Sequence, residues 1–285
     1  MKIYCNFMDG KDFEKAIAPY PELVNANITV FIDHPPKTYD QLKENPTNIF
    51  ITLEPNQLFG IHDWVLQNHN LFNGILTWNE NILNTCDNAY FFAFGVSWLD
   101  KEYVKSADKI EKLFDVSFLC GAKKMIEGHF LRHRLFDRGN EISIPKKWFY
   151  TLDDYKLVDG HHSISHSGIC QGEEKKKLWN SMFSICIENS SNSGYQTEKI
   201  IDALLTKTIP VYWGCTNIGD YYNLDGIIHC KDENEIIQKV NQLTPEYYYS
   251  RKDVIEENYI KAQFYADIFS RFVNIMKEIV KYNDV

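Results

Sequence analysis

The chain has 285 residues, of which 44% are hydrophobic and 24% charged, and its formal net charge is −9. This balance is typical of a folded globular protein and excludes a disordered or fibrous chain. Net acidity argues against nucleic acid as the main partner, although a small anionic ligand needs only local positive charge. No stretch of about 18 apolar residues is present, so we expect no membrane span.

Seven cysteines are widely spaced along the chain, and none forms a C-x-x-C pair. This spacing is poor for a disulfide framework or a zinc site, so reduced thiols are the better interpretation. The apolar run after Met1 is too short, and too soon followed by charge, for a signal peptide. We therefore expect a cytoplasmic protein and leave its oligomeric state open.

Short apolar runs alternate with polar or helical segments in the first hundred residues. The runs lie at 2–8, 28–33, 48–54, 74–79 and 89–95. Each run is apolar almost throughout, as strands of a parallel sheet covered on both faces should be. The first hundred residues therefore predict one α/β module.

The strand and helix pattern restarts after residue 110. We predict strands at 115–120, 146–150, 183–188, 208–214 and 226–230, and helices at 124–138, 197–207 and 232–243. A loop is expected over 151–172, a helix beginning at residue 173, and a helical region over 246–281 that either packs back onto the first domain or mediates assembly. The simplest account is two α/β domains, 1–108 and 109–285, with a ligand in the cleft between them.

The polar loop at 189–196 leads into a helix that Thr197 can cap. Free backbone N–H groups and the dipole at such a helix start favour a phosphate. Lys199 lies in the first helical turn, where a cation opposes the dipole. Either a bound phosphate compensates this charge or Lys199 pairs with a surface carboxylate, and the spacing does not choose between them.

The segment FSICIENSSNSGYQTEKIIDALLTKTIPVYWG, at 183–214, resembles the donor-binding signature of the family 10 glycosyltransferases, the α-1,3/4-fucosyltransferases. That signature has F-E-N-S, a short loop, Y-x-T-E-K, a helix and a P-V-Y-W-G-like strand, all present here in order. The clear resemblance covers about 183–230. It implies a GT-B fold, with two Rossmann-like domains facing across a cleft, the first for the acceptor and the second for the donor.

The resemblance places Asn189, Tyr195, Glu198 and Lys199 at donor-binding positions. Lys199 would neutralise the diphosphate as the glycosidic bond breaks. Glu198 would accept hydrogen bonds from ribose or sugar hydroxyls, and Tyr195 and Asn189 would shape the pocket. Gln196 stands where the family usually has an apolar residue, which leaves the donor sugar open.

Arg132 is the second candidate cation, because it matches a family pattern R-x-x-x-[FY]-D on a helix that faces the diphosphate. Its guanidinium could hold two phosphate oxygens at once. The alternatives are Arg134 or a solvated helix face. Helical spacing points the two arginines in different directions, so at most one should enter the cleft, and the match to the family pattern favours Arg132.

Glu54 is the candidate base. It ends an apolar run at the carboxyl edge of a predicted parallel strand, where α/β active sites form, and Pro55 disfavours a helical conformation there. An inverting transfer needs a carboxylate to accept the proton of the acceptor hydroxyl, and the family has a Glu at a comparable site. Asp33 is the rival, followed by Glu80.

The resemblance implies an inverting, metal-independent enzyme that transfers L-fucose from GDP-fucose to a glycan acceptor without a cofactor. The other common glycosyltransferase fold binds metal through an Asp-x-Asp pair, which this sequence lacks. A different donor such as UDP-xylose, or a nucleotide-sugar-binding protein without catalysis, stays open. A hydrolase or phosphorylase is disfavoured for lack of a suitable carboxylate pair. We interpret His161, His162 and His166 as part of a loop rather than as metal ligands.

Overall fold

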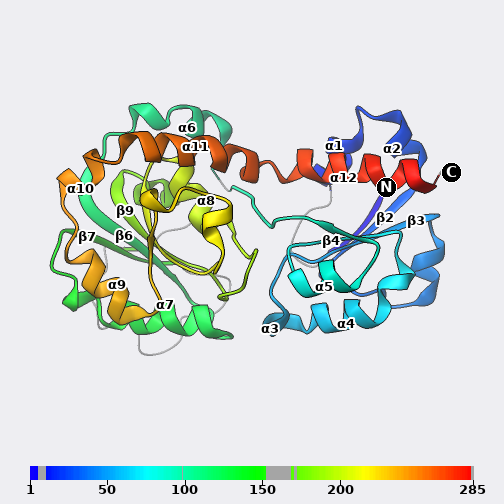
Figure 1. The fold of residues 1–285 in the computed structure, drawn as a ribbon, viewed down its shortest axis with the longest axis horizontal. Helices are drawn as coiled ribbons and strands as arrows, with labels where there is room; N and C mark the ends of the chain where they lie inside the picture. The colour runs from blue at the N-terminus through cyan, green and yellow to red at the C-terminus, as the bar shows by residue number, and fades with distance from the viewer. Residues whose placement is uncertain (6–10, 98, 152–167, 170–171, 284–285) are drawn as a thin grey trace. The chain divides into compact units, whose positions relative to one another are not determined.

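The structure is a computed structural model that describes residues 1–5, 11–97, 99–151, 168–169 and 172–283. The chain forms two compact units. Unit 1 comprises Met1–Phe94, Ser193–Tyr195 and Asp267–Val285, and unit 2 comprises Gly95–Asn192 and Gln196–Ala266. Each unit has a parallel sheet with helices on it, which agrees with the predicted α/β class (Figure 1).

The sheet of unit 1 has the order β1-β2-β3-β4-β5, and all of its pairs are parallel. Its strands are β1 Lys2–Cys5, β2 Ile28–Ile32, β3 Thr47–Ile51, β4 Gly74–Thr77 and β5 Ala89–Phe91. Every residue of β2, β3 and β4 is buried. All five predicted strands are confirmed, and the three central ones are buried as expected of parallel strands covered on both faces.

Helices cover both faces of this sheet. On one face, α4 Ile61–Asn68 and α5 Glu80–Thr85 join a core with β2, β3 and β4. On the other, α12 Ile268–Asn283 packs against α1 Lys11–Ile17 and α2 Pro21–Asn25. A Cβ at Gly74 would lie 2.4 Å from Cδ1 of Ile279, which shows how closely α12 approaches β4. The last helix thus packs back onto the N-terminal domain, one of the two expected outcomes.

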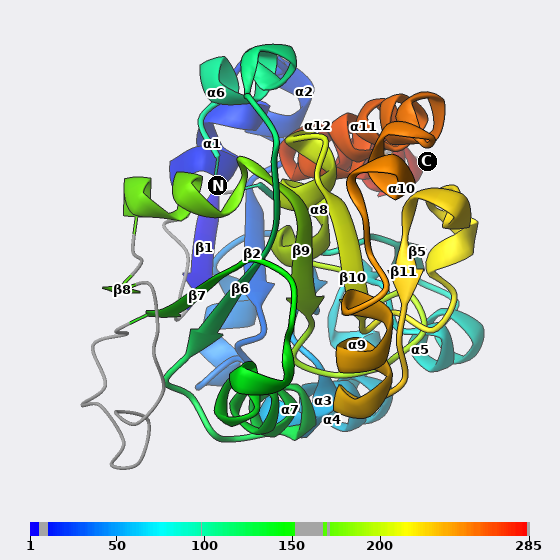
Figure 2. The same cartoon turned by 90° about the vertical axis from the view of Figure 1, so that its left-hand side faces the viewer.

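The sheet of unit 2 has the order β11-β10-β9-β6-β7-β8 and is also parallel throughout (Figure 2). Its strands are β6 Leu113–Gly121, β7 Lys146–Thr151, β8 Gly168–Ile169, β9 Ser181–Ile187, β10 Ile209–Trp213 and β11 Ile228–His229. One hydrophobic core joins this sheet to α7 Glu127–Asp137 and α9 Glu233–Val240, and a second joins it to α8 Glu198–Leu205 and α11 Lys252–Ala266. Strand β9, which leads into the signature loop, is buried along its whole length.

Three expectations for unit 2 differ from the structure. The helix expected from residue 173 is a 3₁₀ helix, Gly172–Leu178, because the chain must already be extended at Ser181 to pair with Leu113. The loop expected over 151–172 contains β8. The helical region over 246–281 is divided into α10 Pro245–Tyr249, α11 and α12, and Asp267 caps the last of these by accepting a hydrogen bond from the Ser270 N–H at 3.0 Å.

The division of the chain also differs from a single boundary between residues 108 and 109. Unit 2 begins at Gly95, because the segment that contains α6 Lys101–Lys105 is attached to it. There Lys176 forms an ion pair with Asp100 at 2.6 Å. The acceptor and donor roles expected for the two domains stay predictions.

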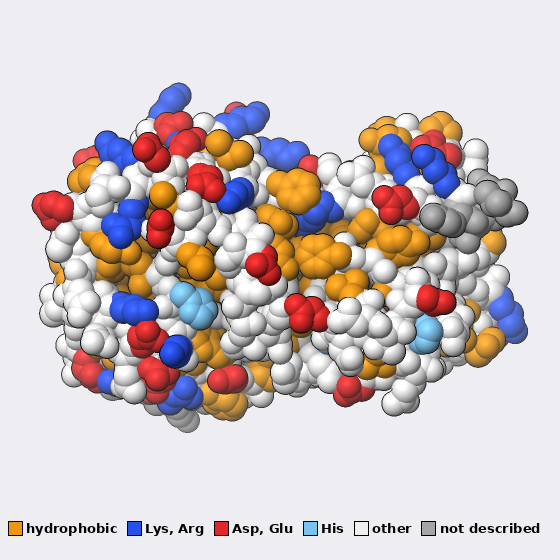
Figure 3. All heavy atoms as spheres, viewed as in Figure 1, with side chains coloured by type: hydrophobic (Ala, Val, Ile, Leu, Met, Phe, Trp, Pro, Cys, Tyr) orange, Lys and Arg blue, Asp and Glu red, His pale blue; other side chains and the backbone are white. Residues whose placement is uncertain are grey.

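The surface view shows Lys and Arg side chains interspersed with Asp and Glu (Figure 3). On the face shown, the described residues form no continuous basic surface of the kind that a nucleic acid requires. Over the described part of the chain, no helix is both long enough and apolar enough to cross a bilayer.

Candidate active site

Glu188 lies directly after β9 and is fully buried. Its carboxylate accepts a hydrogen bond from the Thr197 backbone N–H at 2.8 Å and another from the Thr197 hydroxyl at 2.7 Å. Burial raises the pKa of Glu188, while Lys199 and the two Thr197 contacts act in the opposite direction. Glu188 therefore joins the two ends of the signature loop and fixes where α8 begins. The sequence analysis gave this residue no role.

The start of α8 has the predicted cap. The Thr197 hydroxyl oxygen accepts a hydrogen bond from the Lys199 N–H at 3.4 Å. The Lys199 ammonium lies 3.0 Å from Glu198 Oε1 and 3.8 Å from Glu188 Oε2. Burial opposes the charge of Lys199, but these two carboxylates outweigh it and raise the lysine pKa. Lys199 thus stays protonated, and one of its partners is a buried carboxylate rather than a surface one.

Arg132 lies on α7 and is buried beside the same strand end. Its guanidinium donates to the Ile187 carbonyl oxygen at 2.5 Å and to the side-chain oxygen of Asn189 at 3.0 Å. Arg134 instead pairs with Glu233 at 2.8 Å and is exposed. The structure therefore brings Arg132, and not Arg134, to Asn189. These contacts hold Arg132 in one orientation, and its proposed contact with phosphate stays a prediction.

Two glycines allow close approach around Glu188. A Cβ at Gly128, in the first turn of α7, would lie 1.8 Å from the Glu188 carbonyl oxygen. A Cβ at Gly214 would lie 2.4 Å from Glu188 Cγ and 2.6 Å from the Tyr212 hydroxyl. Gly128 lies inside the helix predicted over 124–138 and was not among the candidate site residues. Its sequence signal was a glycine inside an otherwise helical pattern, which often has a packing reason.

His129 is a further residue of α7 that the sequence analysis did not select. Its Nδ1 accepts hydrogen bonds from the backbone N–H groups of Met125 at 3.2 Å and Ile126 at 3.3 Å. Burial, followed by the nearby charges of Arg132 and Lys199, lowers the His129 pKa to about 3. The ring is therefore neutral at physiological pH.

The candidate base lies in unit 1, after β3. Glu54 is half-buried, and its backbone N–H donates to the Asp33 carboxylate at 2.9 Å, as the Leu53 N–H does at 3.0 Å. Asp33 is buried with a φ of +45°, and burial raises its pKa to about 8. This geometry makes Asp33 a support for the backbone of Glu54 and leaves Glu54 the better candidate base.

Tyr195, although it belongs to the signature, is part of unit 1. Its hydroxyl donates to Glu54 Oε2 at 3.2 Å, and its ring centroid lies 5.0 Å from that of Trp78. The Trp78 indole N–H in turn donates to the Leu53 carbonyl oxygen at 2.8 Å. The structure thus joins two candidates selected on separate grounds, and adds Trp78, which the sequence analysis did not select.

Gln196 is fully buried, and among the described residues neither side-chain polar atom has a hydrogen-bond partner. His161, His162 and His166 lie outside the described residues. Within the described part of the chain, no cluster of three or more His, Cys, Asp or Glu residues could hold a metal ion.

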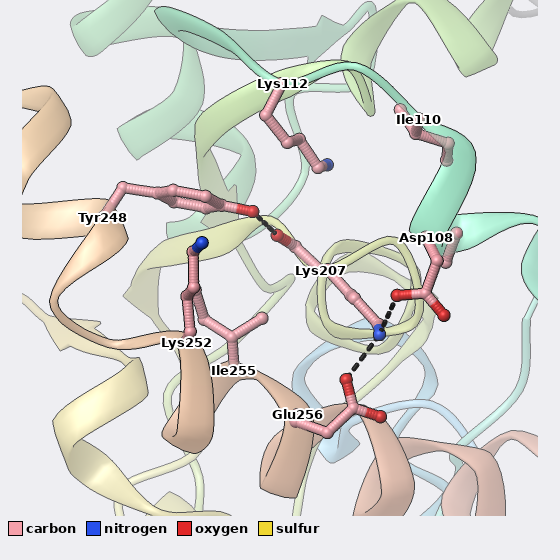
Figure 4. Close-up of a pocket in the computed structure, with 9 residues that line it drawn as sticks. Asp108, Ile110, Lys112, Lys207, Tyr248, Lys252, Ile255 and Glu256 are labelled. Carbon is pink, nitrogen blue, oxygen red and sulfur yellow. Dashed lines mark hydrogen bonds and ion pairs between the residues drawn. The ribbon is translucent and has the colours of Figure 1, made fainter.

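A cavity of about 320 Å³ lies at the other end of α8 (Figure 4). It contains none of the predicted site residues; its lining includes Lys112, Lys207, Tyr248 and Glu256. The Lys207 ammonium pairs with Asp108 and Glu256, and the Lys112 ammonium donates to the Trp179 carbonyl oxygen at 2.5 Å and to the Thr208 hydroxyl oxygen at 2.7 Å. These lysines already serve the packing of unit 2, so we do not assign the cavity to the donor.

Comparisons with known proteins agree with this geometry. Residues 143–273 match the family model described as glycosyltransferase family 10 (fucosyltransferase), C-terminal. The α-(1,3)-fucosyltransferase FucT of Helicobacter pylori is 29% identical over 153 residues, which cover 50% of this chain and 32% of that protein. The chain thus matches about a third of the length of this relative.

Solved structures of α1,3-fucosyltransferase have a similar fold. One of them has a TM-score of 0.58 at 17% identity, covering 98% of this chain and 89% of the other. One described with GDP-fucose has a TM-score of 0.51 at 19% identity, covering 89% and 78%. The expected GT-B type is thereby confirmed. The ordered signature lies inside the matched region, and residues 143–273 are similar to the C-terminal domain of the family 10 glycosyltransferases.

Proposed function

We propose that this protein is an inverting, metal-independent glycosyltransferase that moves L-fucose from GDP-fucose onto a carbohydrate hydroxyl. The observation that carries the proposal is the start of α8, where Lys199 is held protonated in the first turn of a capped helix. A protonated amine beside free backbone N–H groups is suited to a diphosphate leaving group. The match of residues 143–273 to the fucosyltransferase family model supports fucose as the sugar.

The charges around Lys199 define how a diphosphate would bind. Lys199 and Arg132 supply two positive charges, and Glu188 and Glu198 supply two carboxylates. An incoming diphosphate must therefore compete with Glu198 for the ammonium. Glu198 has a side chain that is partly exposed, so it can turn to a ribose or sugar hydroxyl, whereas Glu188 is buried and bound to Thr197. In this proposal Arg132 contributes charge and holds Asn189 at the pocket.

Glu54 is the base of the proposed reaction. It would take the proton of the acceptor hydroxyl as the oxygen attacks the anomeric carbon and the nucleoside diphosphate leaves. Its backbone is fixed through Asp33, and its half-buried side chain can be reached by an acceptor. No cofactor is needed, because the bond broken in the nucleotide sugar provides the driving force.

A second candidate is a transferase that uses another donor, such as UDP-xylose. Gln196 favours it, because a buried amide without partners stands where the family has an apolar side chain. An unpaired buried amide is costly, so a polar group of the donor that reached it would be selected strongly.

Thermal unfolding with a panel of nucleotides in EDTA tests the proposal, because a ligand that binds the folded state must stabilise it. We expect GDP and GDP-fucose to raise Tm, UDP and UDP-xylose to have no effect, and fucose transfer to persist in EDTA. A rise in Tm confined to the UDP compounds would show that the donor is a UDP-sugar rather than GDP-fucose. Loss of activity in EDTA would contradict metal independence. Binding of a nucleotide sugar without turnover on any glycan would indicate a binding protein without catalysis.

A further inference from the structure

Three successive residues of the signature contact the loops that follow β3 and β4 of unit 1. The Ser193 hydroxyl donates to Glu80 Oε1 at 2.5 Å. Gly194 has a φ of +77°, and a Cβ there would lie 2.6 Å from the Trp78 carbonyl oxygen. Tyr195 contacts both Trp78 and Glu54. We call Ser193–Tyr195 the strap.

Hydrogen bonds hold both the side chain of Glu54 and the backbone around it. Asp33 binds its backbone N–H, and Trp78 binds the carbonyl oxygen of the preceding Leu53. Tyr195 binds the side-chain carboxylate itself. Tyr195 and Trp78 are both almost fully buried, so the phenol cannot easily move away. The glutamate side chain, which otherwise loses considerable rotamer freedom when it is fixed, is thereby oriented in advance.

The chemistry of this contact has a definite direction. An ionised carboxylate can only accept hydrogen bonds, so the Tyr195 hydroxyl must be the donor. A carboxylate has about four lone-pair positions on its two oxygens, so a hydrogen bond from one phenol does not prevent it from accepting another from the hydroxyl of an acceptor. A base must lie within hydrogen-bond reach of the proton it takes, and a small misplacement costs a large factor in rate.

We propose that Tyr195 is a positioning residue for Glu54, which orients the carboxylate of the base through the hydrogen bond from its hydroxyl. Only Gln196 separates Tyr195 from Thr197, the cap of α8. This inference rests on the proposed function and gives Tyr195 a role other than shaping the donor pocket.

Tyr195→Phe tests the inference, because it keeps the ring against Trp78 and removes only the hydroxyl. We expect kcat for fucose transfer to fall roughly tenfold and the acidic limb of its pH profile to move. The Kd of GDP, measured by calorimetry, should stay within about twofold of wild type. A tenfold weaker Kd with an unchanged kcat would make Tyr195 a donor ligand and overturn the inference.

A double-mutant cycle with Glu54→Gln separates this inference from the proposed function. If Tyr195 acts through Glu54, Tyr195→Phe should cause no further loss of kcat in the Glu54→Gln background. Losses that multiply would overturn the positioning role while leaving the base in place. Full turnover by Glu54→Gln alone would show that Glu54 is not the base, and the inference about Tyr195 would then fail as well. Thermal unfolding of each variant confirms that the fold is retained.

Discussion

The start of α8 in unit 2 and the end of β3 in unit 1 hold their charged groups in opposite ways. At α8, Lys199 has two carboxylates within 4 Å, and Arg132 donates to two carbonyl oxygens. At β3, the carboxylate of Glu54 receives a neutral phenol, and its backbone is held by Asp33. In the first region opposite charges balance one another, whereas in the second hydrogen bonds fix the orientation of one carboxylate.

This difference predicts where the effects of substitution divide. Removing one of the charged residues at the start of α8 leaves a buried partner without its opposite charge, so stability and turnover should both fall. The carboxylate of the half-buried Glu54 accepts a hydrogen bond from a neutral phenol, and its loss should affect turnover far more than stability.

Glu54→Gln should produce the largest effect. We expect kcat to fall by roughly 10³-fold, because a positioned general base contributes about 10²–10⁴-fold. The free energy of unfolding in urea should change by less than about 1 kcal/mol, as for other substitutions away from the core. Asp33→Asn is the matched comparison, and it should lower stability as well as turnover. A fully active Glu54→Gln enzyme would direct the search to Glu80.

Lys199→Ala should reduce kcat/KM by about 10²–10³-fold, the usual loss when a group that stabilises developing charge is removed. It should also lower the free energy of unfolding, because Glu188 stays buried without its compensating cation. Lys207→Gln is the control at the other end of α8, where both partner carboxylates are largely exposed. Equal losses in the two variants would show that Lys199 has only a structural role.

The two arginines of α7 offer a matched pair for stability. Arg132→Met should cost about 3 kcal/mol of unfolding free energy, because buried carbonyl oxygens lose a charged donor. Arg134→Met breaks an exposed pair with Glu233 and should cost about 0–1 kcal/mol. Urea denaturation measures both. A small effect at Arg132 would mean that its guanidinium is available for phosphate.

The smallest effect concerns pH. Burial lowers the pKa of His129 in unit 2 to about 3 and that of His62 in unit 1 to about 4, both below the ordinary 6.5. At these two histidines the unfolded chain therefore binds more protons in this window, and their contribution to stability should be complete above pH 6.5 and decline as pH falls toward 3. His129→Asn should flatten the decline measured by urea unfolding between pH 7 and pH 4.5. An unchanged slope of unfolding free energy against pH would show that groups other than His129 cause the decline.

Local features of the sequence predicted the strands and the cap at Thr197, because apolar runs and N-cap preferences act over a few residues. The signature likewise selected Lys199, whose partners Glu188 and Glu198 are near it in the chain. The contact between Tyr195 and Glu54 joins residues 141 positions apart, and no periodicity encodes it. The supports of Glu54 from Asp33 and Trp78 depend in the same way on which strands become neighbours.

The return of α12 to unit 1 has a consequence for the order in which the molecule can be completed during synthesis. The β4 face near Gly74 is covered by Ile279, a residue made more than two hundred positions later. Unit 2, in contrast, has all of its chain by Ala266. Since domains fold as their chain becomes available, the unit that begins second is finished first. Until the last helix emerges, the N-terminal sheet presents an uncovered apolar surface, the state in which a nascent chain most needs a chaperone.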